Sequence, residues 1–568
     1  MQKKRWQIAQ PLTPQANEAL AAFSPVLRQV LFNRGYATDV EARAFLRAET
    51  NLNTDPFQMM GMDQAIARIR RALDQEEKIA IYGDYDVDGV TATALLVQSI
   101  QSLGGNAKPY IPNRFDEGYG LNPEALTLLK ANGTGLVITV DCGIRSPDEA
   151  AHAQSIGLDM IISDHHQPAE GVLPVALAVI NPKQAGDRYP DKDLAGVGVA
   201  YKIIQALFAS MERKDANIQL EDFLDLVALG TVADLAPLIG ENRVLVRKGL
   251  QKIRETKRQG LFSLAAVADL SLPRTTATSI GFMLGPRLNA AGRLESAEAA
   301  FELLTTTEVQ RAGELAQQLN IQNRLRQELT RKIQQEAETM ALSEDPGTCL
   351  LFAVHPEFNS GVVGLAAARL VETYYRPAVV GQVLEGTTRC SCRSIPEFHI
   401  TKALDLCQDL LIRHGGHAAA AGFSVSNENL FALKERLQMI ALEQLGGMDL
   451  RQTLNADAEV ALSDLRIELL RHLEYLQPTG YGNPEAVFVT RNVRVTSIRS
   501  VGSEGKHLKL VVTDGHVTFD AIGFRLGHLQ PELPLNVDLI FTFETNEYNG
   551  RTSLQLNLKD VRASGIPD

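Results

Sequence analysis

The chain is poor in cysteine, has no long apolar run and carries no excess of positive charge. Its 568 residues include five cysteines, and no pair has the spacing of a thiolate zinc site. Cys390 and Cys392 are therefore predicted to be structural, in a reducing compartment. The basic start of residues 1–6 is not followed by the apolar core of a signal peptide, and no run approaches membrane-spanning length. A soluble, cytoplasmic protein that does not enter a membrane is expected.

The net charge of −12 conceals one strongly basic segment. Residues 243–258 combine many basic side chains with a single acid, Glu255, at near-helical spacing. Such a stripe on a helix could follow a phosphate backbone, or it could be a solvated helix face. Both interpretations stay open at this point. The basic residues are Arg243, Arg247, Lys248, Lys252, Arg254, Lys257 and Arg258.

Three short apolar runs, at residues 78–82, 135–140 and 158–163, have the length and the β-branched content of buried parallel strands. Their alternation with helix-like segments predicts an α/β domain with a doubly wound parallel sheet. The glycines in residues 195–200 match neither a P-loop nor a dinucleotide-binding loop, so we expect them to begin a helix and to allow close packing. The expected helices cover residues 90–103, 122–132 and 147–156.

Acidic and imidazole side chains follow these runs, and a further acid closes residues 230–234. Ligands of an open parallel sheet bind beyond the carboxyl ends of its strands, so these side chains should converge there. Crowded carboxylates repel one another unless a cation neutralises them, and oxygen ligands with one or two imidazoles suit Mn²⁺ or Mg²⁺ better than zinc. Two such ions could support hydrolysis of a phosphate ester. The side chains are Asp84, Asp86, Asp141, Asp164, His165, His166 and Asp234.

Three further parts follow the sheet domain. Residues 308–342 are polar and contain no proline, so they should form a long connecting helix. Residues 348–445 contain apolar strands and a helix of a second α/β unit. Alternating stretches beyond residue 453 predict an OB-fold β-barrel, a fold that commonly binds single-stranded nucleic acid, with Tyr548 and Arg551 as candidate contacts. The expected domains are an N-terminal segment 1–40, a sheet domain 41–305, a connecting helix 306–345, a second α/β domain 346–447 and a barrel 448–568.

The triplet Asp164-His165-His166 is the signature of the DHH phosphoesterases, and four longer strings resemble the RecJ-type exonucleases of that family. The resemblance covers nearly the whole chain and identifies the second α/β unit with the DHH-associated domain. It implies a metal-dependent enzyme of DNA repair and recombination that degrades single-stranded DNA from the 5′ end to mononucleotides with Mn²⁺ or Mg²⁺. The strings are residues 111–121, 286–293, 415–422 and 478–484.

The resemblance also implies roles for single residues. His166 would face the scissile phosphate, and Asp141 would bridge the ions where two bind. Many members of the family have a histidine where this chain has Tyr82, and a phenol is a poor ligand at neutral pH. We therefore expect one tightly held ion, with a second that binds weakly or arrives with substrate. The implied metal ligands are Asp84, Asp86, Asp141, His165 and Asp234.

A pocket for the 5′-terminal phosphate is expected in the DHH-associated domain. Two glycines let the backbone approach an anion closely, while an imidazole, a hydroxyl and a guanidinium can donate hydrogen bonds to it. The family usually has a histidine where this chain has Asn359, and the role of that position stays open. The pocket residues are Ser391, Arg393, Gly415, Gly416 and His417, with Arg114 and Arg287 contributing from the first domain.

Two other classes of function stay open. A phosphodiesterase for short oligonucleotides would share the metal residues but would need neither the basic stripe nor the barrel. A non-catalytic single-strand-binding relative would be expected to lose the aspartates first, and all of them are present. The expected partner is single-stranded DNA, together with a helicase and a single-strand DNA-binding protein in the cell. The protein is expected to be a monomer.

Overall fold

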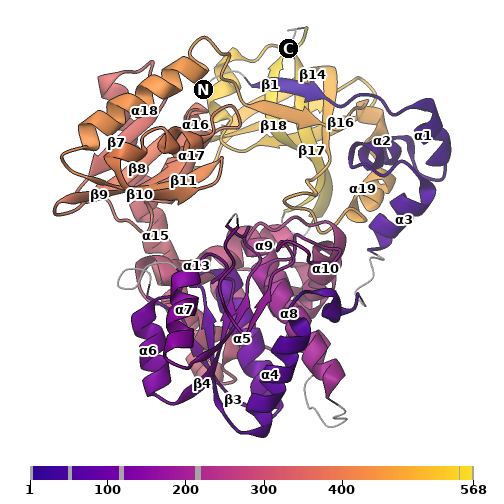
Figure 1. Ribbon diagram of the computed structural model, residues 1–568. Coiled ribbons are helices and arrows are strands. Elements are labelled where there is room, and N and C mark those ends of the chain that lie inside the picture. Colours follow the sequence, from indigo (N-terminus) through magenta and orange to yellow (C-terminus); the bar gives the residue numbers. More distant parts are fainter. Residues whose placement is uncertain are drawn as a thin grey trace. The chain divides into compact units, whose positions relative to one another are not determined.

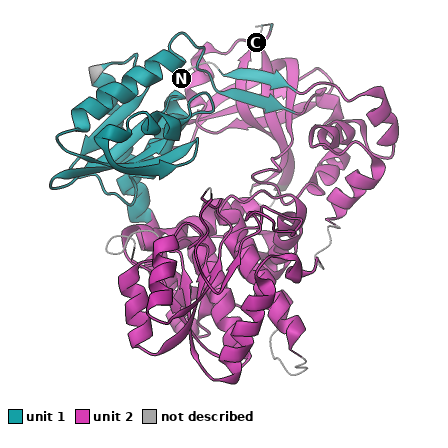
Figure 2. Cartoon of the chain, in the orientation of Figure 1, with its two compact units in different colours: residues 1–8, 324–456, 565–568 teal, residues 9–323, 457–564 magenta. Residues whose placement is uncertain are grey.

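The computed structural model describes residues 4–48, 54–113, 120–169, 171–211, 219–548 and 551–565. The chain divides into two compact units (Figure 2), each assembled from segments that are far apart in the sequence. The smaller unit contains residues 324–456 with both chain ends, 1–8 and 565–568, and the larger unit contains residues 9–323 and 457–564. Within the described ranges, no helix combines the length and the apolar character needed to span a bilayer.

A parallel sheet forms the centre of the larger unit. Its strands lie in the order β3 (Asn106–Tyr110), β2 (Lys78–Gly83), β4 (Thr134–Val140), β5 (Asp159–Ser163) and β6 (Ala178–Ile180). Successive side chains of β2 alternate between two cores, because strand side chains point to opposite faces of a sheet. Helices α4 (Met62–Asp74), α5 (Val87–Ser102) and α8 (Gly196–Ser210) cover one face, and α6 (Pro123–Ala131) and α7 (Pro147–Ser155) cover the other (Figure 1). The predicted doubly wound α/β architecture is confirmed.

Further helices complete this part of the larger unit. Helix α9 (Leu224–Ala233) is apolar on all sides, and it is surrounded by α5, α8 and α10 (Gly240–Arg254). A π-helical turn, η4 (Ile280–Leu284), leads into α13 (Gly285–Leu294), and both pack against α9. The predicted connecting helix is confirmed as α15 (Val309–Glu344), which runs from one unit into the other. The other helices are α11 (Gln259–Val267), α12 (Ala277–Ser279) and α14 (Glu298–Thr305).

The C-terminal strands close into a barrel, which confirms the predicted OB-type fold. Around the barrel the order is β14 (Val487–Val501), β15 (His507–Thr513), β16 (Thr518–Gly523), β18 (Arg551–Ala563) and β17 (Asn536–Tyr548). The pairing of β17 with β14 closes the ring, and β13 (Ala458–Glu459) adds to β14 at its edge. Closure leaves the barrel strands without an open edge.

The N-terminal helices belong with the barrel rather than with the parallel sheet. Leu31 of α2 (Pro25–Asn33) and Phe45 of α3 (Asp39–Arg47) share a hydrophobic core with Leu469 of α19 (Ile467–Glu474) and Phe541 of β17. Helix α1 (Pro14–Ala19) precedes them. The structure thus differs from the domain boundary expected at residue 41. An amphipathic pattern shows that one face of a helix is buried, but it does not show which element covers that face.

The smaller unit contains the predicted second α/β sheet. Its strands lie in the order β10 (Leu411–Gly416), β11 (Ala420–Ser426), β9 (Thr387–Arg393), β8 (Ala378–Val383) and β7 (Leu351–His355). Helix α16 (Val363–Tyr374) and the second half of α15 pack on one face, and α17 (Ile400–Asp405) and α18 (Leu430–Leu445) pack on the other. Strand β1 (Arg5–Ile8) pairs in parallel with β12 (Thr453–Ala456).

Candidate active site

The predicted site residues meet at the carboxyl edge of the parallel sheet. Asp84, Asp141 and Asp164 each follow directly after β2, β4 and β5, where the polypeptide leaves the sheet. The strand pairing continues one residue further, since Asp84 N donates to Val140 O at 3.3 Å and Asp141 N to Ser163 O at 3.1 Å. These carboxylates therefore begin neighbouring loops at the same edge, as the parallel topology requires.

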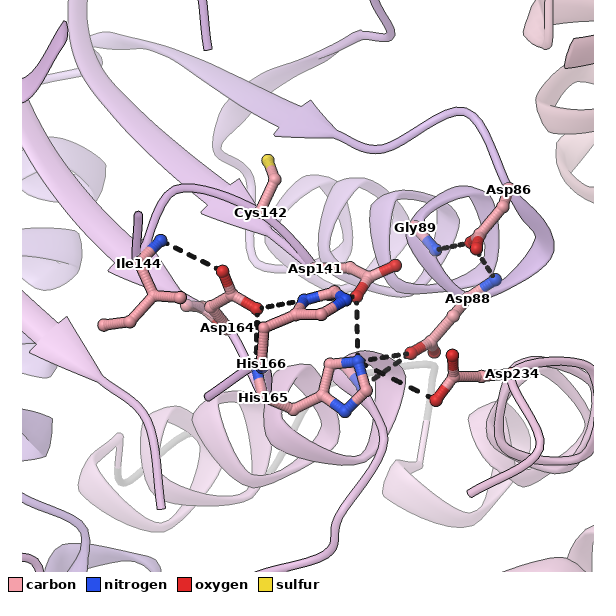
Figure 3. Close-up of polar contacts among 12 residues, drawn as sticks. Asp86, Asp88, Gly89, Asp141, Cys142, Ile144, Asp164, His165, His166 and Asp234 are labelled. Carbon is pink, nitrogen blue, oxygen red and sulfur yellow. Dashed lines mark hydrogen bonds and ion pairs between the residues drawn. The ribbon is translucent and has the colours of Figure 1, made fainter. Parts of the chain in front are cut away.

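His165 lies at the centre of the cluster (Figure 3). Its Nε2 is 3.1 Å from Asp141 Oδ1, 3.7 Å from Asp234 Oδ2 and 3.8 Å from Asp88 Oδ2. Asp234 reaches the cluster from the C-terminal end of α9. Carboxylates of three separate segments thus surround one imidazole.

Three overlapping groups of side chains in the cluster could hold a metal ion. Every ligand that the sequence predicted takes part in at least one of them, and Asp88 takes part although it was not among the predicted ligands. Within each group the possible ligand atoms lie within 4.8 Å of one another. The groups are Asp84 with Asp86 and Asp141, Asp141 with His165 and His166, and Asp88 with His165 and Asp234.

Asp88 is fully buried at the start of α5, and the N-terminus of α8 holds it in place. Its Oδ2 accepts a hydrogen bond from Gly196 N at 2.6 Å, and its Oδ1 accepts one from Val197 N at 2.8 Å. The glycines of this segment begin a helix, as the sequence predicted. A Cβ built on Gly196 would lie 2.8 Å from Asp141 Cβ, so a residue without a side chain is needed for this close approach.

The second aspartate of the motif has a local structural role as well. Asp86 is the N-cap of α5, and its Oδ1 accepts hydrogen bonds from Asp88 N at 2.9 Å and Gly89 N at 3.1 Å. Asn289 of α13 accepts a further hydrogen bond from Val87 N at 3.1 Å. The start of α5 is therefore fixed from two sides.

Burial and mutual repulsion raise the pKa of the acids in the cluster. Burial, followed by the charges of Asp88 and Asp86, raises the pKa of Asp141 well above its ordinary value. Burial and the charge of Asp86 raise the pKa of Asp88 to about 7. Burial and the charges of Asp88 and Asp86 raise the pKa of Asp234 to about 8. A divalent cation at this position would favour the ionised carboxylates and reverse these shifts.

The pKa values of the two signature histidines are shifted in opposite directions. Burial, together with the charge of His166, lowers the pKa of His165 to about 3, so His165 is neutral and can act as a ligand. Burial also lowers the pKa of His166, but the hydrogen bond of its Nδ1 to Asp164 Oδ1 at 2.8 Å and the charge of Asp164 raise that pKa to about 9. His166 is therefore a cation at neutral pH. Asp164 is fixed in turn by Ile144 N, which donates to its Oδ2 at 3.0 Å.

The cluster fits a divalent metal ion. Asp141 Oδ1 and His165 Nε2 are buried and form no hydrogen bond with any residue in the described part of the chain. A buried polar atom without such a partner costs free energy, and a shared cation would satisfy both atoms. Carboxylates with one or two imidazoles are the ligands that Mn²⁺ or Mg²⁺ accepts in proteins.

Tyr82, at the position where the resemblance expects histidine, belongs to the core. Its side chain is fully buried, its hydroxyl donates to Gly120 O at 3.1 Å, and its ring packs against Tyr110. The phenol is therefore a core side chain whose hydroxyl is bound by the backbone of Gly120.

Several residues of the predicted phosphate pocket lie on neighbouring strands of the smaller unit. Ser391 of β9 pairs with Gly422 of β11, which pairs with Gly415 of β10, so a hydroxyl and two glycines form one row across three strands. Arg393 Nη1 donates to Ser391 Oγ at 3.2 Å. A Cβ built on Gly364, in the first turn of α16, would lie 2.8 Å from Ser391 Oγ. A helix N-terminus thus adjoins the pair, and such termini favour anions.

The other described residues of the predicted phosphate pocket lie at the end of β10 and on α13. Gly416 ends β10 with φ of 147°, and His417 follows it as an exposed residue. Arg287 lies on α13, where it donates to Met283 O at 2.6 Å and to Asn320 Oδ1 at 3.1 Å. Asn359 accepts a hydrogen bond from Gly361 N at 2.8 Å, in the turn that leads into α16. Arg114 lies outside the described residues.

The basic stripe on α10 is not a continuous surface for DNA. Arg243 is 2% exposed, and its guanidinium donates to the carbonyl groups of Phe45, Leu476, Pro478 and Tyr475. The prediction that Arg243 contacts DNA is wrong, because this side chain joins α10 to α3 and to the segment after α19. Helical spacing alone cannot distinguish a buried arginine from a solvated one.

The other predicted DNA contacts differ in their surroundings. Arg247 is half-buried and donates to Leu46 O at 2.7 Å, and Arg254 is exposed but donates to Thr275 O at 3.0 Å. Lys248 is exposed. Tyr548 and Arg551 face each other where β17 and β18 meet, and their side chains lie outside the described part of the structure.

Comparison with known proteins places the chain in a family. The model of the DHH family, N-terminal domain, matches residues 78–231, that of the DHHA1 domain matches residues 347–442, and that of the RecJ OB domain matches residues 456–560. The class is thus a DHH-family protein that joins a parallel-sheet domain to a DHHA1 domain and an OB domain.

Individual relatives narrow this class. The chain is 37% identical over 573 residues to the single-stranded-DNA-specific exonuclease RecJ of Bacillus subtilis, and the match covers 99% of this chain and 71% of that protein. It also resembles crystal structures of RecJ from Thermus thermophilus in complex with Mn²⁺ and with Mg²⁺. Their TM-scores are 0.85 and 0.79 at 30% and 28% identity, over 99% of this chain and 80% and 79% of those chains. The chain belongs to the RecJ family.

Proposed function

We propose that this protein is a metal-dependent exonuclease that hydrolyses single-stranded DNA from its 5′ end to mononucleotides, in DNA repair and recombination. The observation that carries the proposal is the convergence of Asp84, Asp141, His165 and Asp234 on one buried site at the carboxyl edge of the sheet. The RecJ relatives are named as single-stranded-DNA-specific exonucleases, and two of their structures contain Mn²⁺ or Mg²⁺.

The metal ligands that we propose are Asp84, Asp86, Asp141, His165 and Asp234. When bound, Mn²⁺ or Mg²⁺ would lower the pKa of water and offset the negative charge that develops on a phosphate during hydrolysis. Asp141 is shared by two of the three ligand groups, which supports a bridging role. Asp88 holds the N-terminus of α8 against the start of α5, and Asp164 orients the ring of His166.

His166 is proposed to hold the scissile phosphate. Because its pKa is raised to about 9, its ring is protonated at pH 7 and can donate a charged hydrogen bond. Asp164 accepts from Nδ1 and so leaves Nε2 to face an anion. A side chain that is 37% exposed can meet substrate while its other nitrogen stays fixed.

The second part of the proposal concerns the 5′ end of the strand. Ser391, Arg393, Gly415, Gly416 and His417 are proposed to bind its terminal phosphate. Arg114 and Arg287 are proposed as phosphate contacts of the strand in the larger unit. Support comes from the row of Ser391, Gly422 and Gly415 beside the N-terminus of α16. A pocket that recognises the end of a chain would make the enzyme an exonuclease rather than an endonuclease. A strand with a 5′ phosphate is expected to be the better substrate.

An end-labelled nuclease assay tests the proposed function. The wild-type protein should shorten a single strand from its 5′ end in Mn²⁺ or Mg²⁺, and Asp141→Ala should lose this activity. Shortening from the 3′ end, or full activity of Asp141→Ala, would overturn the proposal. Faster turnover of a dinucleotide than of a long strand would favour a short-oligonucleotide phosphodiesterase instead, and tight DNA binding without hydrolysis would favour a non-catalytic relative.

We further propose that the enzyme acts as a monomer in the cytoplasm, supplied with single strands by a helicase and a single-strand DNA-binding protein. The five cysteines support a reducing compartment, since all of them are free thiols. Light scattering of the purified protein would test the monomer, and co-purification from cells would test the two partners.

A further inference from the structure

The turn η4, which packs against α9 and so against the helix that ends at the proposed ligand Asp234, carries an aromatic side chain that packing does not explain. Phe282 is 80% exposed, although phenylalanine is usually buried. It lies in η4, whose neighbouring residues Ile280 and Leu284 are fully buried. Ile280 and Leu284 therefore anchor the turn in the core, while Phe282 lies in solvent.

The sequence explains why the backbone forms a π-turn here. Pro286 has no N–H, so it cannot donate to the carbonyl of Phe282 four residues earlier, as an α-helix requires. The backbone forms a wider turn instead, in which Gly285 N donates to Ile280 O. Single π-turns inside helices are rare, and they occur often at functional sites.

This turn lies beside segments that carry the site. A Cβ built on Gly285 would lie 3.4 Å from Ala233 Cβ, and Ala233 precedes the proposed ligand Asp234. Further along the same helix, Asn289 accepts the hydrogen bond from Val87 N, next to Asp86. The segment from η4 to α13 thus borders the cluster on the side of Asp86 and Asp234.

Two more apolar side chains are exposed on or beside the loop that follows α9. Leu235, next to Asp234, is 68% exposed. Tyr481 is 65% exposed, and its carbonyl accepts a hydrogen bond from Leu238 N at 2.7 Å. Exposed apolar side chains that gather beside a polar site mark a surface that binds a ligand with an apolar face.

We propose that Phe282 is a stacking platform for an unpaired nucleobase of the strand that is being hydrolysed, an inference that rests on the proposed function. A nucleobase has an apolar face that matches an exposed phenyl ring, and stacking of this kind tolerates any base. Bases of a duplex are already stacked and paired, so the platform selects single strands. Phe282 is in this sense a positioning residue, because it contacts the substrate away from the reacting phosphate.

Binding of 5′-phosphorylated single strands in EDTA tests the proposal, with Phe282→Ala, Phe282→Trp and a matched control. The control is Phe262→Ala, which removes a phenyl ring that is 58% exposed on α11. Loss of one stacked base predicts about 5- to 100-fold weaker binding by Phe282→Ala. Phe262→Ala should bind as the wild type does. Equal affinity of the two alanine variants would overturn the proposal.

Two further readouts separate stacking from a structural role. A single abasic site moved along the strand should weaken binding to the wild type at one position, and this penalty should vanish in Phe282→Ala. Phe282→Trp should retain affinity, and the strand should quench the emission of the introduced indole. The chain's one native tryptophan, Trp6, is buried, so the strand should not quench it and the change in emission can be assigned to position 282. An abasic penalty that is the same in both proteins, or unquenched emission, would overturn the inference. If the wild type hydrolyses single strands while these readouts fail, the inference fails and the proposed function stands; if the wild type hydrolyses none, both fail.

Discussion

Because α8 approaches the acid cluster closely, one added methyl group at the start of α8 should disturb the cluster. Gly196 begins α8, and a Cβ built there would lie 2.8 Å from Asp141 Cβ and 3.0 Å from Asp88 Oδ2. Gly198 is two residues further along the same helix, and a Cβ there would lie 3.4 Å from Leu194 Cδ2, an ordinary contact. We expect Gly196→Ala to disrupt the metal cluster and Gly198→Ala to leave it intact.

The size of the effect follows from these distances. Carbon atoms separate by roughly 3.5–4.0 Å at contact, so Gly196→Ala must displace α8 or Asp141 by about 0.7 Å or more. Displacement of α8 would weaken the hydrogen bonds from Gly196 N and Val197 N to Asp88, and each bond to a charged group contributes ~1.5–3 kcal/mol. Displacement of Asp141 moves a proposed ligand, and a shift of about 1 Å near a reacting centre can lower the rate by ~100-fold.

Calorimetric titration with Mn²⁺ and an end-labelled nuclease assay would measure both consequences. For Gly196→Ala we expect at least ~10-fold weaker Mn²⁺ binding, since the loss of ~1.4 kcal/mol already gives that factor, and a rate lower by about 10- to 100-fold. Gly198→Ala should bind Mn²⁺ normally and melt at the same or a higher temperature, because alanine favours a helix interior over glycine by up to ~1 kcal/mol. Normal Mn²⁺ affinity in Gly196→Ala, or equal losses in the two variants, would refute the reasoning.

Three more predictions follow from the burial and the charge of particular groups. Without metal, the melting temperature should fall as the pH rises from 6.5 to 9, because the raised pKa values of Asp88 and Asp234, about 7 and about 8, favour protonated acids in the folded state; excess Mg²⁺ should remove the part of this fall that comes from the two acids. Arg243→Ala should destabilise the protein by at least ~3 kcal/mol without changing the salt dependence of DNA binding. If Lys248 contacts a phosphate, Lys248→Ala should reduce the slope of log affinity against log salt concentration by about 1. Tyr82→Phe should cost ~1 kcal/mol, from the lost hydrogen bond to Gly120 O, and a titration should find the metal stoichiometry unchanged.

The two signature histidines do not reverse the predicted fall in melting temperature between pH 6.5 and 9. Between pH 6.5 and 9 the lowered pKa of His165 has little effect, because that imidazole is neutral in the folded state and largely neutral in the unfolded state. The raised pKa of His166, about 9, also makes the folded state less stable as the pH rises, so it acts in the same direction as the two acids. A melting temperature that rises across this window would contradict the assignment.

Local sequence patterns were enough to predict most of the fold and most of the metal cluster. Each predicted strand of the parallel sheet agrees with the observed one to within a residue at either end, because short β-branched runs bounded by polar residues have few alternative structures. Since parallel strands end at one edge, the position of Asp84, Asp141 and His165 in the sequence was enough to place them together. The long connecting helix followed in the same way from a polar segment without proline.

Residues whose role depends on a distant partner could not be found in this way. Asp88 has the same sequence surroundings as Asp84 and Asp86, and only the arrival of the α8 N-terminus distinguishes it. Arg243 has the spacing of a surface arginine, and only the packing of α3 and the segment after α19 makes it a buried donor. Both sets of contacts join segments that are far apart in the sequence, and no local pattern encodes such a pairing.

The number of acids in the cluster bears on how many ions it can hold, despite the tyrosine at position 82. Asp84, Asp86, Asp88, Asp141 and Asp234 would carry more negative charge than one divalent ion neutralises, even with His166 protonated. In the metal-free protein part of this surplus is held as protons, since the pKa values of Asp88 and Asp234 are near neutrality. A second ion would displace those protons, so its affinity should depend on pH more steeply than that of the first. Because position 82 offers no imidazole, we still expect the second ion to bind more weakly than the first, although the charge that attracts it is present.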